Sequence, residues 1–464
     1  MKKISGAIII NDDKILLVKR SPTDSDMPNL WSLPAGNHKK NEDSKTAVIR
    51  ELKEETNLIC TYSQFLYKLK RSKWEVDIFL IKCENYNYKK DNVEIADINF
   101  FGISELPEKI VIDSYIIIQK FSEIIFSKSI SYPKLVDQTF SAIFYTHIFP
   151  KISSLNFYNN NTPYTIYKFI IETTPYRKFK SVVPFLLSSP LKNNFTIFLL
   201  PEFAFAIWTL LDDIVDNKKT RYNQITAPIK FGLNKSVISL FTFRNVITSL
   251  FKNKTESKDL DRIIDSIEDS GLILNQRLNN TLDISYEDYI KQSMLRTRFL
   301  RESWTGALRQ TNLSTNELNT IFLIQEKSAI IGQLINDYFD MTKANYEDFD
   351  MRIISSPIIF LKEKVNKKEF NELNSFWNTK CNNNKSNYIS LIKKYKIKHV
   401  LKEHIINQMS NILSQINNSD LACFQKEILI NWHEMSFNDF APNTEYKFDK
   451  TRFLENINTI IEKY

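Results

Sequence analysis

Three glutamates crowd one short stretch near the start of the chain. In GNHKKNEDSKTAVIRELKEETNL, residues 36–58, Glu51 lies three residues before Glu54 and four before Glu55. On an α-helix this spacing puts the three carboxylates on one face, where like charges repel by about 0.2–0.5 kcal/mol per pair. The stretch is either a solvated acidic face, with Arg50 and Lys53 as counter-charges, or a functional cluster. The residues around it decide between these readings.

Two further acidic clusters follow later in the chain. The apolar run LPEFAFAIWTLL ends at Asp212, Asp213 and Asp216. About 120 residues later, SAIIGQL leads into Asn336, Asp337 and Asp340 in the same spacing. One such cluster could be a helix-capping accident, but two facing clusters at the mouth of a helical bundle would hold metal ions that clamp an anionic diphosphate.

Composition limits the alternatives. The chain has 464 residues, 43% hydrophobic and 25% charged, which is typical of a globular protein of two or three domains. Lys and Arg exceed Asp and Glu by 62 to 54, a net charge of +8 that favours anionic partners, but the basic residues are scattered, so we expect no nucleic-acid partner. Among seven glycines there is neither a G-x-G-x-x-G nor a P-loop pattern.

The pattern of apolar residues changes at about residue 125. Before it, β-branched and aromatic runs predict strands, with one helix at about 43–57. After it, apolar residues recur at helical spacing and predict an all-α region. We therefore expect two domains, residues 1–122 and 130–464.

No targeting or membrane segment is expected. The N-terminal apolar run is too short for a signal peptide. The longest apolar stretch, 197–211, is too short to span a membrane and predicts a buried helix. The four cysteines are far apart in sequence and form no disulfide or zinc pattern, so a reducing cytoplasm fits best.

The first cluster resembles the Nudix box, G-x5-E-x7-R-E-U-x-E-E-x-G-U, in which U is aliphatic. Gly36, Glu42 and Arg50 stand at the box positions ahead of the three glutamates. Asn57 replaces the last glycine, and asparagine is the next-best residue for a left-handed helix end. The resemblance covers about residues 1–120, including the WSLPAG segment before the box.

This resemblance implies a hydrolase that splits a prenyl or nucleoside diphosphate. Glu51, Glu54 and Glu55 would hold a divalent metal, Mg²⁺ or Mn²⁺, and Arg50 would pair with a box glutamate to fix the cluster. Glu94, outside the box, is the candidate general base. An isopentenyl diphosphate isomerase, which shares the fold, remains an alternative, although the unbroken hydrolase-type box disfavours it.

Residues 130–460 resemble the trans-isoprenyl diphosphate synthases. DDIVD and QLINDYFD are similar to the two aspartate-rich motifs of that family, with Gln333 in place and Asn336 where the family has Asp. The resemblance implies Mg²⁺ at both motifs and ionisation of an allylic diphosphate. The same resemblance implies substrate-binding roles for Arg177, Lys178, Lys180, Arg221, Arg296, Thr297, Gln333 and Lys343.

Departures from the family pattern keep other reactions open. Pro175 and Tyr176 replace paired glycines, and Arg221 is followed by Tyr222 instead of a second arginine. The allylic side of the site is retained, while the isopentenyl side is altered. A terpene cyclase, a prenyltransferase to a non-isoprenoid acceptor and a non-catalytic prenyl diphosphate sensor are the alternatives.

The expected protein is a cytoplasmic bifunctional enzyme, an α/β/α Nudix sandwich followed by an all-α isoprenoid synthase helical bundle. Its partners would be small-molecule prenyl diphosphates or nucleoside diphosphate derivatives, and a homodimer through the helical domain is an open alternative. Ile207 and Trp208, one turn before Asp212, would form the floor of a prenyl pocket and limit the product to fifteen carbons. An ordinary core position is the competing reading of Trp208.

Overall fold

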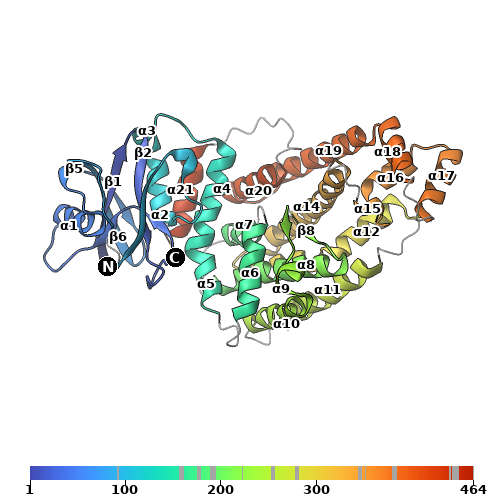
Figure 1. Cartoon of the computed structure of the whole chain (residues 1–464), viewed down its shortest axis with the longest axis horizontal. Helices are drawn as coiled ribbons and strands as arrows, with labels where there is room; N and C mark the ends of the chain where they lie inside the picture. The colour runs from blue at the N-terminus through green and yellow to red at the C-terminus, as the bar shows by residue number, and fades with distance from the viewer. Residues whose placement is uncertain are drawn as a thin grey trace. The chain divides into compact units, whose positions relative to one another are not determined.

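The computed structural model describes the chain except for residues 91–92, 156–160, 175–178, 189–194, 222, 252–256, 277–281, 343–346, 351, 379–383, 438–439, 441–448 and 463–464. It divides into two compact units, residues 1–155 together with 446–464, and residues 156–445. Figure 1 shows strands in the first unit and mostly helices in the second. The predicted fold class, an α/β unit followed by an all-α unit, is confirmed.

The N-terminal unit is built on a mixed sheet. Its elements are β1 (Lys2–Asn11), β2 (Lys14–Arg20), β3 (Trp31–Ser32), β4 (Ala35–Asn37), α1 (Ser44–Thr56), β5 (Cys60–Lys70), β6 (Trp74–Cys83), β7 (Ile95–Phe101), η1 (Ile103–Glu105), α2 (Ile112–Lys120), α3 (Ser122–Ile125), α4 (Tyr132–Ile143), η2 (Phe144–Ile148), α5 (Phe149–Ser153) and α21 (Lys450–Ile461).

Strand β1 organises this sheet. It pairs in parallel with β6 and antiparallel with β2 and β4, and the main strand order is β3-β2-β1-β6-β5. Ala7 and Ile9 join Val48 and Leu52 of α1 in one core cluster. Ile8, which faces the opposite side of the strand, is equally buried, so both faces of the sheet are covered. This double cover fixes α1 against the sheet.

Two findings extend the predicted N-terminal domain. Helix α2 was not expected, because the prediction placed only one helix before residue 120. The unit also reaches beyond the predicted boundary of 122 and includes α21 from the far end of the chain. Both α4 and α21 pack against α2, and Lys450 Nζ of α21 donates to Ser122 Oγ at 2.7 Å. These contacts make α21 part of the first unit.

The second unit is a helical bundle with one short hairpin. Its elements are α6 (Asn161–Thr173), α7 (Phe179–Leu187), η3 (Phe195–Leu199), α8 (Leu200–Val215), β8 (Thr220–Arg221), β9 (Gln224–Ile225), α9 (Ala227–Phe231), α10 (Leu233–Leu250), α11 (Ser257–Gln276), α12 (Tyr286–Arg296), α13 (Arg298–Arg309), α14 (Thr315–Thr342), α15 (Glu347–Asp350), α16 (Ser356–Lys362), α17 (Lys367–Asn378), α18 (Asn384–Lys394), α19 (Ile397–Asn418) and α20 (Cys423–Ser436).

Helix α8 lies in the core of this bundle. It packs against α7, α10 and α13, and most of its side chains are buried, as predicted for the apolar stretch 197–211. Among the helices of the described segments, none is long and apolar enough to cross a membrane.

Candidate functional site

Helix α1 presents the first acidic cluster because both of its ends are capped. The Asp43 carboxylate accepts hydrogen bonds from the backbone N–H groups of Lys45 and Thr46, each at 3.0 Å. At the other end, Asn57 adopts the left-handed conformation with φ 57°. Asparagine therefore serves at the position where the box has glycine, as the sequence predicted.

Arg50 ties three acidic side chains together. Its Nε and Nη2 donate to the two carboxylate oxygens of Glu42, both at 2.8 Å. Its Nη1 donates to Glu51 and to Glu54, again at 2.8 Å. The bidentate bond to Glu42 is the geometry in which a guanidinium binds a carboxylate best, and it holds the pKa of Glu42 at about 2.

Gly36 is required by the close approach of β4 to α1. A Cβ atom at this position would lie 1.9 Å from Cδ of Glu51. No side chain can be tolerated there while Glu51 keeps its place. The glycine of the box is thus explained by the glutamate it faces.

Glu55 and Glu51 lie in poor contact with water. Burial raises the pKa of Glu55 well above its ordinary value, and it raises the pKa of Glu51 in the same direction. The charge of Glu94, in the turn before β7, contributes to both shifts. The exposed Glu94 carboxylate therefore belongs electrostatically to the cluster.

The glutamate cluster of α1 fits a divalent cation. Within the described parts of the chain, no three acidic, His or Cys side chains already form a complete metal-binding group. However, Oε2 of Glu55 is buried and has no hydrogen-bond partner among the described residues. A buried carboxylate oxygen without a partner is costly, and a hard cation would satisfy it.

The first aspartate cluster of the helical unit is already neutralised by neighbouring cations. Arg221 of β8 lies 2.5 Å from Asp212 and 2.7 Å from Asp213. Lys218 lies 2.7 Å from Asp212 and 3.2 Å from Asp216. All three aspartates are buried, and burial raises the pKa of Asp213 despite its partner Arg221.

Asp337 of the second cluster is enclosed by hydrogen-bond donors. Its Oδ2 accepts from the Tyr289 hydroxyl at 2.5 Å and from the backbone N–H of Ser356 at 2.6 Å. Its Oδ1 accepts from the amide of Gln333 at 2.5 Å. Asn336 is exposed, and Asp340 accepts from the backbone N–H of Asp348 at 3.4 Å.

These two clusters do not fit a set of metal ions as they are arranged. Carboxylate oxygens of Asp212, Asp213 and Asp337 are occupied by Lys218, Arg221 and the donors around Asp337. A cation could bind these three residues only after those partners move away. The first aspartate cluster thus serves as a buried ion-pair network in this structure.

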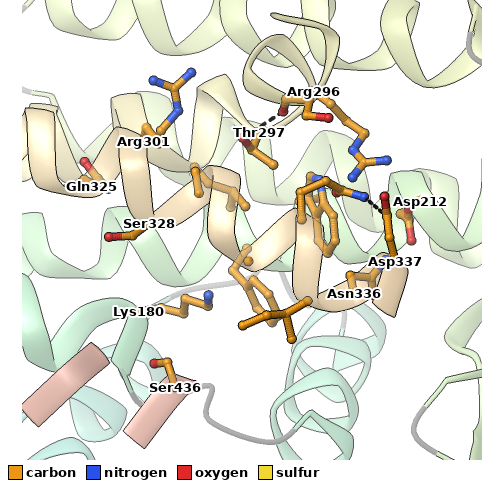
Figure 2. Close-up of a pocket in the computed structure, with 18 of the residues that line it drawn as sticks. Lys180, Asp212, Arg296, Thr297, Arg301, Gln325, Ser328, Asn336, Asp337 and Ser436 are labelled. Atoms are coloured by element: carbon orange, nitrogen blue, oxygen red, sulfur yellow. Dashed lines mark hydrogen bonds between the residues drawn. The ribbon is translucent and has the colours of Figure 1, made fainter. Parts of the chain in front are cut away.

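A cavity of about 480 Å³ lies beside both clusters. Figure 2 shows Asp212, Asn336 and Asp337 at one end of this cavity, with Arg296 above them. The predicted residues that line it are Lys180, Trp208, Asp212, Arg221, Arg296, Thr297, Gln333, Asn336 and Asp337. Arg177, Lys178 and Lys343 lie outside the described residues.

Trp208 lines the cavity, whereas Ile207 is buried in the core. The Trp208 ring stacks on Phe205, and the Arg221 guanidinium lies 5.7 Å from its centroid. The tryptophan therefore lines the cavity close to Arg221.

Sequence reasoning missed several residues of this site. Lys218 follows the first cluster by two residues, so its pairing with Asp216 could have been suspected. Tyr289 is about 50 residues from Asp337, and only the packing of α12 against α14 brings them together.

Comparison with known proteins supports this division of the chain. Residues 2–121 match the family model described as the NUDIX domain. The N-terminal unit contains a Nudix domain. Over 66 residues the chain is 36% identical to a CTP pyrophosphohydrolase of Escherichia coli (strain K12), a match that covers 14% of this chain and 48% of that protein. The chain thus spans about half the length of this relative.

The helical unit is similar to solved isoprenyl diphosphate synthases. A polyprenyl synthase from Caulobacter crescentus CB15 matches with a TM-score of 0.51 and 15% identity over 59% of this chain and 87% of that chain. A decaprenyl diphosphate synthase from Rhodobacter capsulatus matches with a TM-score of 0.52 and 14% identity over 60% and 90%. At this identity the similarity establishes the fold. The predicted fusion of the two folds is therefore confirmed.

Proposed function

We propose that the Nudix domain hydrolyses a diphosphate anhydride with the help of a divalent metal, Mg²⁺ or Mn²⁺. The observation that carries this proposal is the cluster on α1, in which Arg50 orders Glu42, Glu51 and Glu54 beside the buried Glu55. Glu51, Glu54 and Glu55 would hold the metal. When bound, it supplies Lewis-acid activation of water and neutralises the charge that develops on the diphosphate.

The protein side chains around the cluster would divide the remaining work. Arg50 holds Glu51 and Glu54 in place through bonds of 2.8 Å. Glu94 is proposed as the base that accepts the proton of the attacking water, because its charge acts on both Glu51 and Glu55. In the free structure, Lys39 and Arg50 balance the charge of Glu54.

The substrate is proposed to be a nucleoside or prenyl diphosphate, and one experiment separates these classes. The whole protein is incubated with Mg²⁺ and either cytidine diphosphate or geranyl diphosphate, and the products are identified. A monophosphate product that is lost in Glu54→Gln supports the proposal. No hydrolysis of any diphosphate by the folded wild-type protein would refute it.

We infer that the helical unit binds and processes an allylic diphosphate. Support comes from the cavity, which has basic side chains from Lys218, Arg221 and Arg296 at one end and apolar walls from Phe205 and Leu300. Basic residues suit the diphosphate, and apolar walls suit a hydrocarbon or a carbocation.

The organic part of this ligand is proposed to be short, up to fifteen carbons. A volume of about 480 Å³ and the bulk of Trp208 support this limit. Incubation with geranyl diphosphate, with and without isopentenyl diphosphate, tests elongation directly. If the unit elongates, Trp208→Ala should lengthen the product by one or more five-carbon units, and an unchanged product from the folded variant would place the limit elsewhere.

A further inference from the structure

The cavity of the helical unit has a second polar end. On α14, the lining residues Gln325, Ser328, Gly332 and Asn336 lie on one helix face. Gln325 precedes Asn336 by 11 residues and Ser328 precedes it by eight, which places them about 16 Å and 12 Å from the charged end at 1.5 Å per residue. Figure 2 shows Gln325 and Ser328 at the opposite side of the cavity from Asp212 and Asp337.

Gln325 brings an amide group to this end of the cavity. The residue is only 8% exposed, and its amide forms no hydrogen bond with any described residue. The amide of a cavity-lining glutamine that has no partner among these residues is open to a ligand. It therefore favours a ligand that brings both a donor and an acceptor to this end.

Ser328 adds a hydrogen-bond acceptor beside this amide. His433 Nδ1 lies 2.6 Å from the Leu429 carbonyl oxygen, so Nδ1 carries a proton and donates it there. Burial lowers the pKa of His433 to about 4, which keeps the ring neutral at pH 7. The single proton of the Ser328 hydroxyl then serves Nε2 of His433 or the Ile324 carbonyl oxygen, each at 2.6 Å, and the serine oxygen keeps its lone pairs for a ligand.

Arg301 and Lys180, the cationic side chains near these groups, each have a counter-charge among the described residues. Arg301 donates to Glu326 at 3.0 Å and to the Met294 carbonyl oxygen at 2.7 Å. Lys180 lies over the Phe205 ring at 5.1 Å, and the charge of Glu202 acts on it. A charged group would gain little here, whereas an uncharged hydrogen-bonding group would gain a partner.

We propose that the inner end of this cavity is a binding site for an uncharged hydrogen-bonding group at the tail of a diphosphate ligand. The inference rests on the proposed binding of a diphosphate at the other end. A plain hydrocarbon tail would leave Gln325 unpaired, and a tail that ends in a hydroxyl group would pair it. The same hydrogen-bonding chemistry could come from the planar base of a nucleoside diphosphate, for which Trp304 and Trp432, whose ring centroids lie 4.9 Å apart, together offer an aromatic wall.

Binding is tested on the full chain by calorimetry with three probes: geranyl diphosphate, 8-hydroxygeranyl diphosphate and cytidine diphosphate. We expect 8-hydroxygeranyl diphosphate to bind about tenfold more tightly than geranyl diphosphate, because its hydroxyl group satisfies Gln325. In Gln325→Leu, this preference should vanish or reverse. Gln292→Leu, a matched change on α12 one turn before Arg296, should keep it.

The outcomes separate the two proposals. Equal affinity for the two geranyl compounds in the wild type, with weaker binding of cytidine diphosphate, would overturn this inference and leave allylic diphosphate binding intact. A preference for cytidine diphosphate that Gln325→Leu removes would support the polar inner site and assign it to a base, against an allylic ligand. Absence of binding by all three probes to the folded protein would overturn both.

Discussion

At the scale of single residues, Arg50 is the hub of the Nudix cluster. One guanidinium contacts Glu42, Glu51 and Glu54 and also donates to the Asn37 carbonyl oxygen at 2.9 Å. A lysine could not reproduce this arrangement, because it lacks the planar fork that serves several acceptors at once. The order of the cluster before metal binding depends on this one side chain.

Gly36→Ala tests how tightly the cluster is packed. The new Cβ would lie 1.9 Å from Cδ of Glu51, so the glutamate must move. We expect hydrolysis to fall by about 100-fold, since a shift near 1 Å in a catalytic group has that effect. Stability should fall by about 1–3 kcal/mol.

Gly102→Ala is the matched control for this prediction. Its added Cβ would meet Glu105 only at 3.6 Å, an ordinary contact, and its φ of −71° suits alanine. Hydrolysis rates and unfolding curves of the two variants are compared. Similar activity in both would show that Glu51 does not need the space beside Gly36.

At the scale of elements, the hairpin of β8 and β9 closes the end of α8. It brings Arg221 onto two buried aspartates, while Lys218 reaches Asp212 and Asp216 just before the hairpin. The charge of the acidic cluster is thus balanced by the segment that directly follows it. Any cation that binds these aspartates must compete with the protein's own basic side chains.

Arg221→Ala should convert this closed cluster into a metal site. Loss of the guanidinium leaves Asp212 and Asp213 buried without their partner, which should destabilise the unit by about 3 kcal/mol. Addition of Mg²⁺ should then raise the melting temperature of the variant but not that of the wild type. Calorimetric titration with Mg²⁺ measures the new affinity.

Arg298→Ala provides the comparison. Arg298 pairs with Asp269 at 2.9 Å in the same unit, but the two side chains are 35% and 44% exposed. Its removal should change stability by less than about 1 kcal/mol and create no response to Mg²⁺. A wild-type protein that is itself stabilised by Mg²⁺ at this unit would contradict the closed arrangement of the aspartates.

Helix α20 makes the helical unit sensitive to acid through His433. The pKa of this buried ring is lowered to about 4, while an unfolded histidine titrates near 6.5. Between these values the unfolded chain binds more protons, so stability falls as the pH drops from about 6.5 to 4, by a total of about 3 kcal/mol. His433→Gln should flatten this slope in urea unfolding curves.

The exposed His399 of α19 supplies the control, because His399→Gln should leave the slope unchanged. His147 of the N-terminal unit is partly buried, and desolvation lowers its pKa to about 4 as well. Any pH dependence of stability that remains in His433→Gln should therefore come from the unfolding of the N-terminal unit. An unaltered slope in the helical unit would mean that His433 is already protonated in the folded state.

Some elements could be predicted from sequence because their signals are local. Helix 43–57 was expected from its spacing and is observed as Ser44–Thr56, with Asp43 and Asn57 as its caps. Helix α2 was missed, because its isoleucines favour strands until packing against α4 and α21 decides otherwise. Helix α21 could not be assigned to the first unit, since no local pattern records which unit a helix joins.

The site shows the same limit. Spacing alone identified Glu51, Glu54 and Glu55 as one group. Spacing could not show that Arg221 covers the aspartates, which depends on the hairpin, or that Gln325 points into a cavity. In the sequence, a glutamine that lines a cavity cannot be distinguished from one at the surface.

At the scale of the whole molecule, the two units keep their chemistry apart. The Nudix cluster uses residues of β4 and α1, and the cavity is lined only by residues of the helical unit. Glu54→Gln should therefore abolish diphosphate hydrolysis and leave the affinity for geranyl diphosphate unchanged. Asp213→Ala should leave diphosphate hydrolysis unchanged and alter the affinity for geranyl diphosphate, because Asp213 pairs with Arg221, which lines the cavity.

Both activities are measured on the same full-length preparations, and circular dichroism confirms that each variant is folded. Asp213 is buried, so its loss also leaves Arg221 with one carboxylate instead of two. Parallel loss of hydrolysis and of ligand affinity in Glu54→Gln would argue against two independent sites.

The position of α21 has a consequence for how the molecule is made. This helix completes the first unit, where Asn458 accepts from Arg71 at 2.9 Å and Ile457 is fully buried, yet it is synthesised after the roughly 290 residues of the helical unit. At about 5–20 residues per second, a ribosome needs roughly 15–60 s for that stretch. For this interval the Nudix domain emerges without its closing helix. A premature stop within the helical unit would leave the earliest-made unit permanently incomplete, although every residue of its box had been translated.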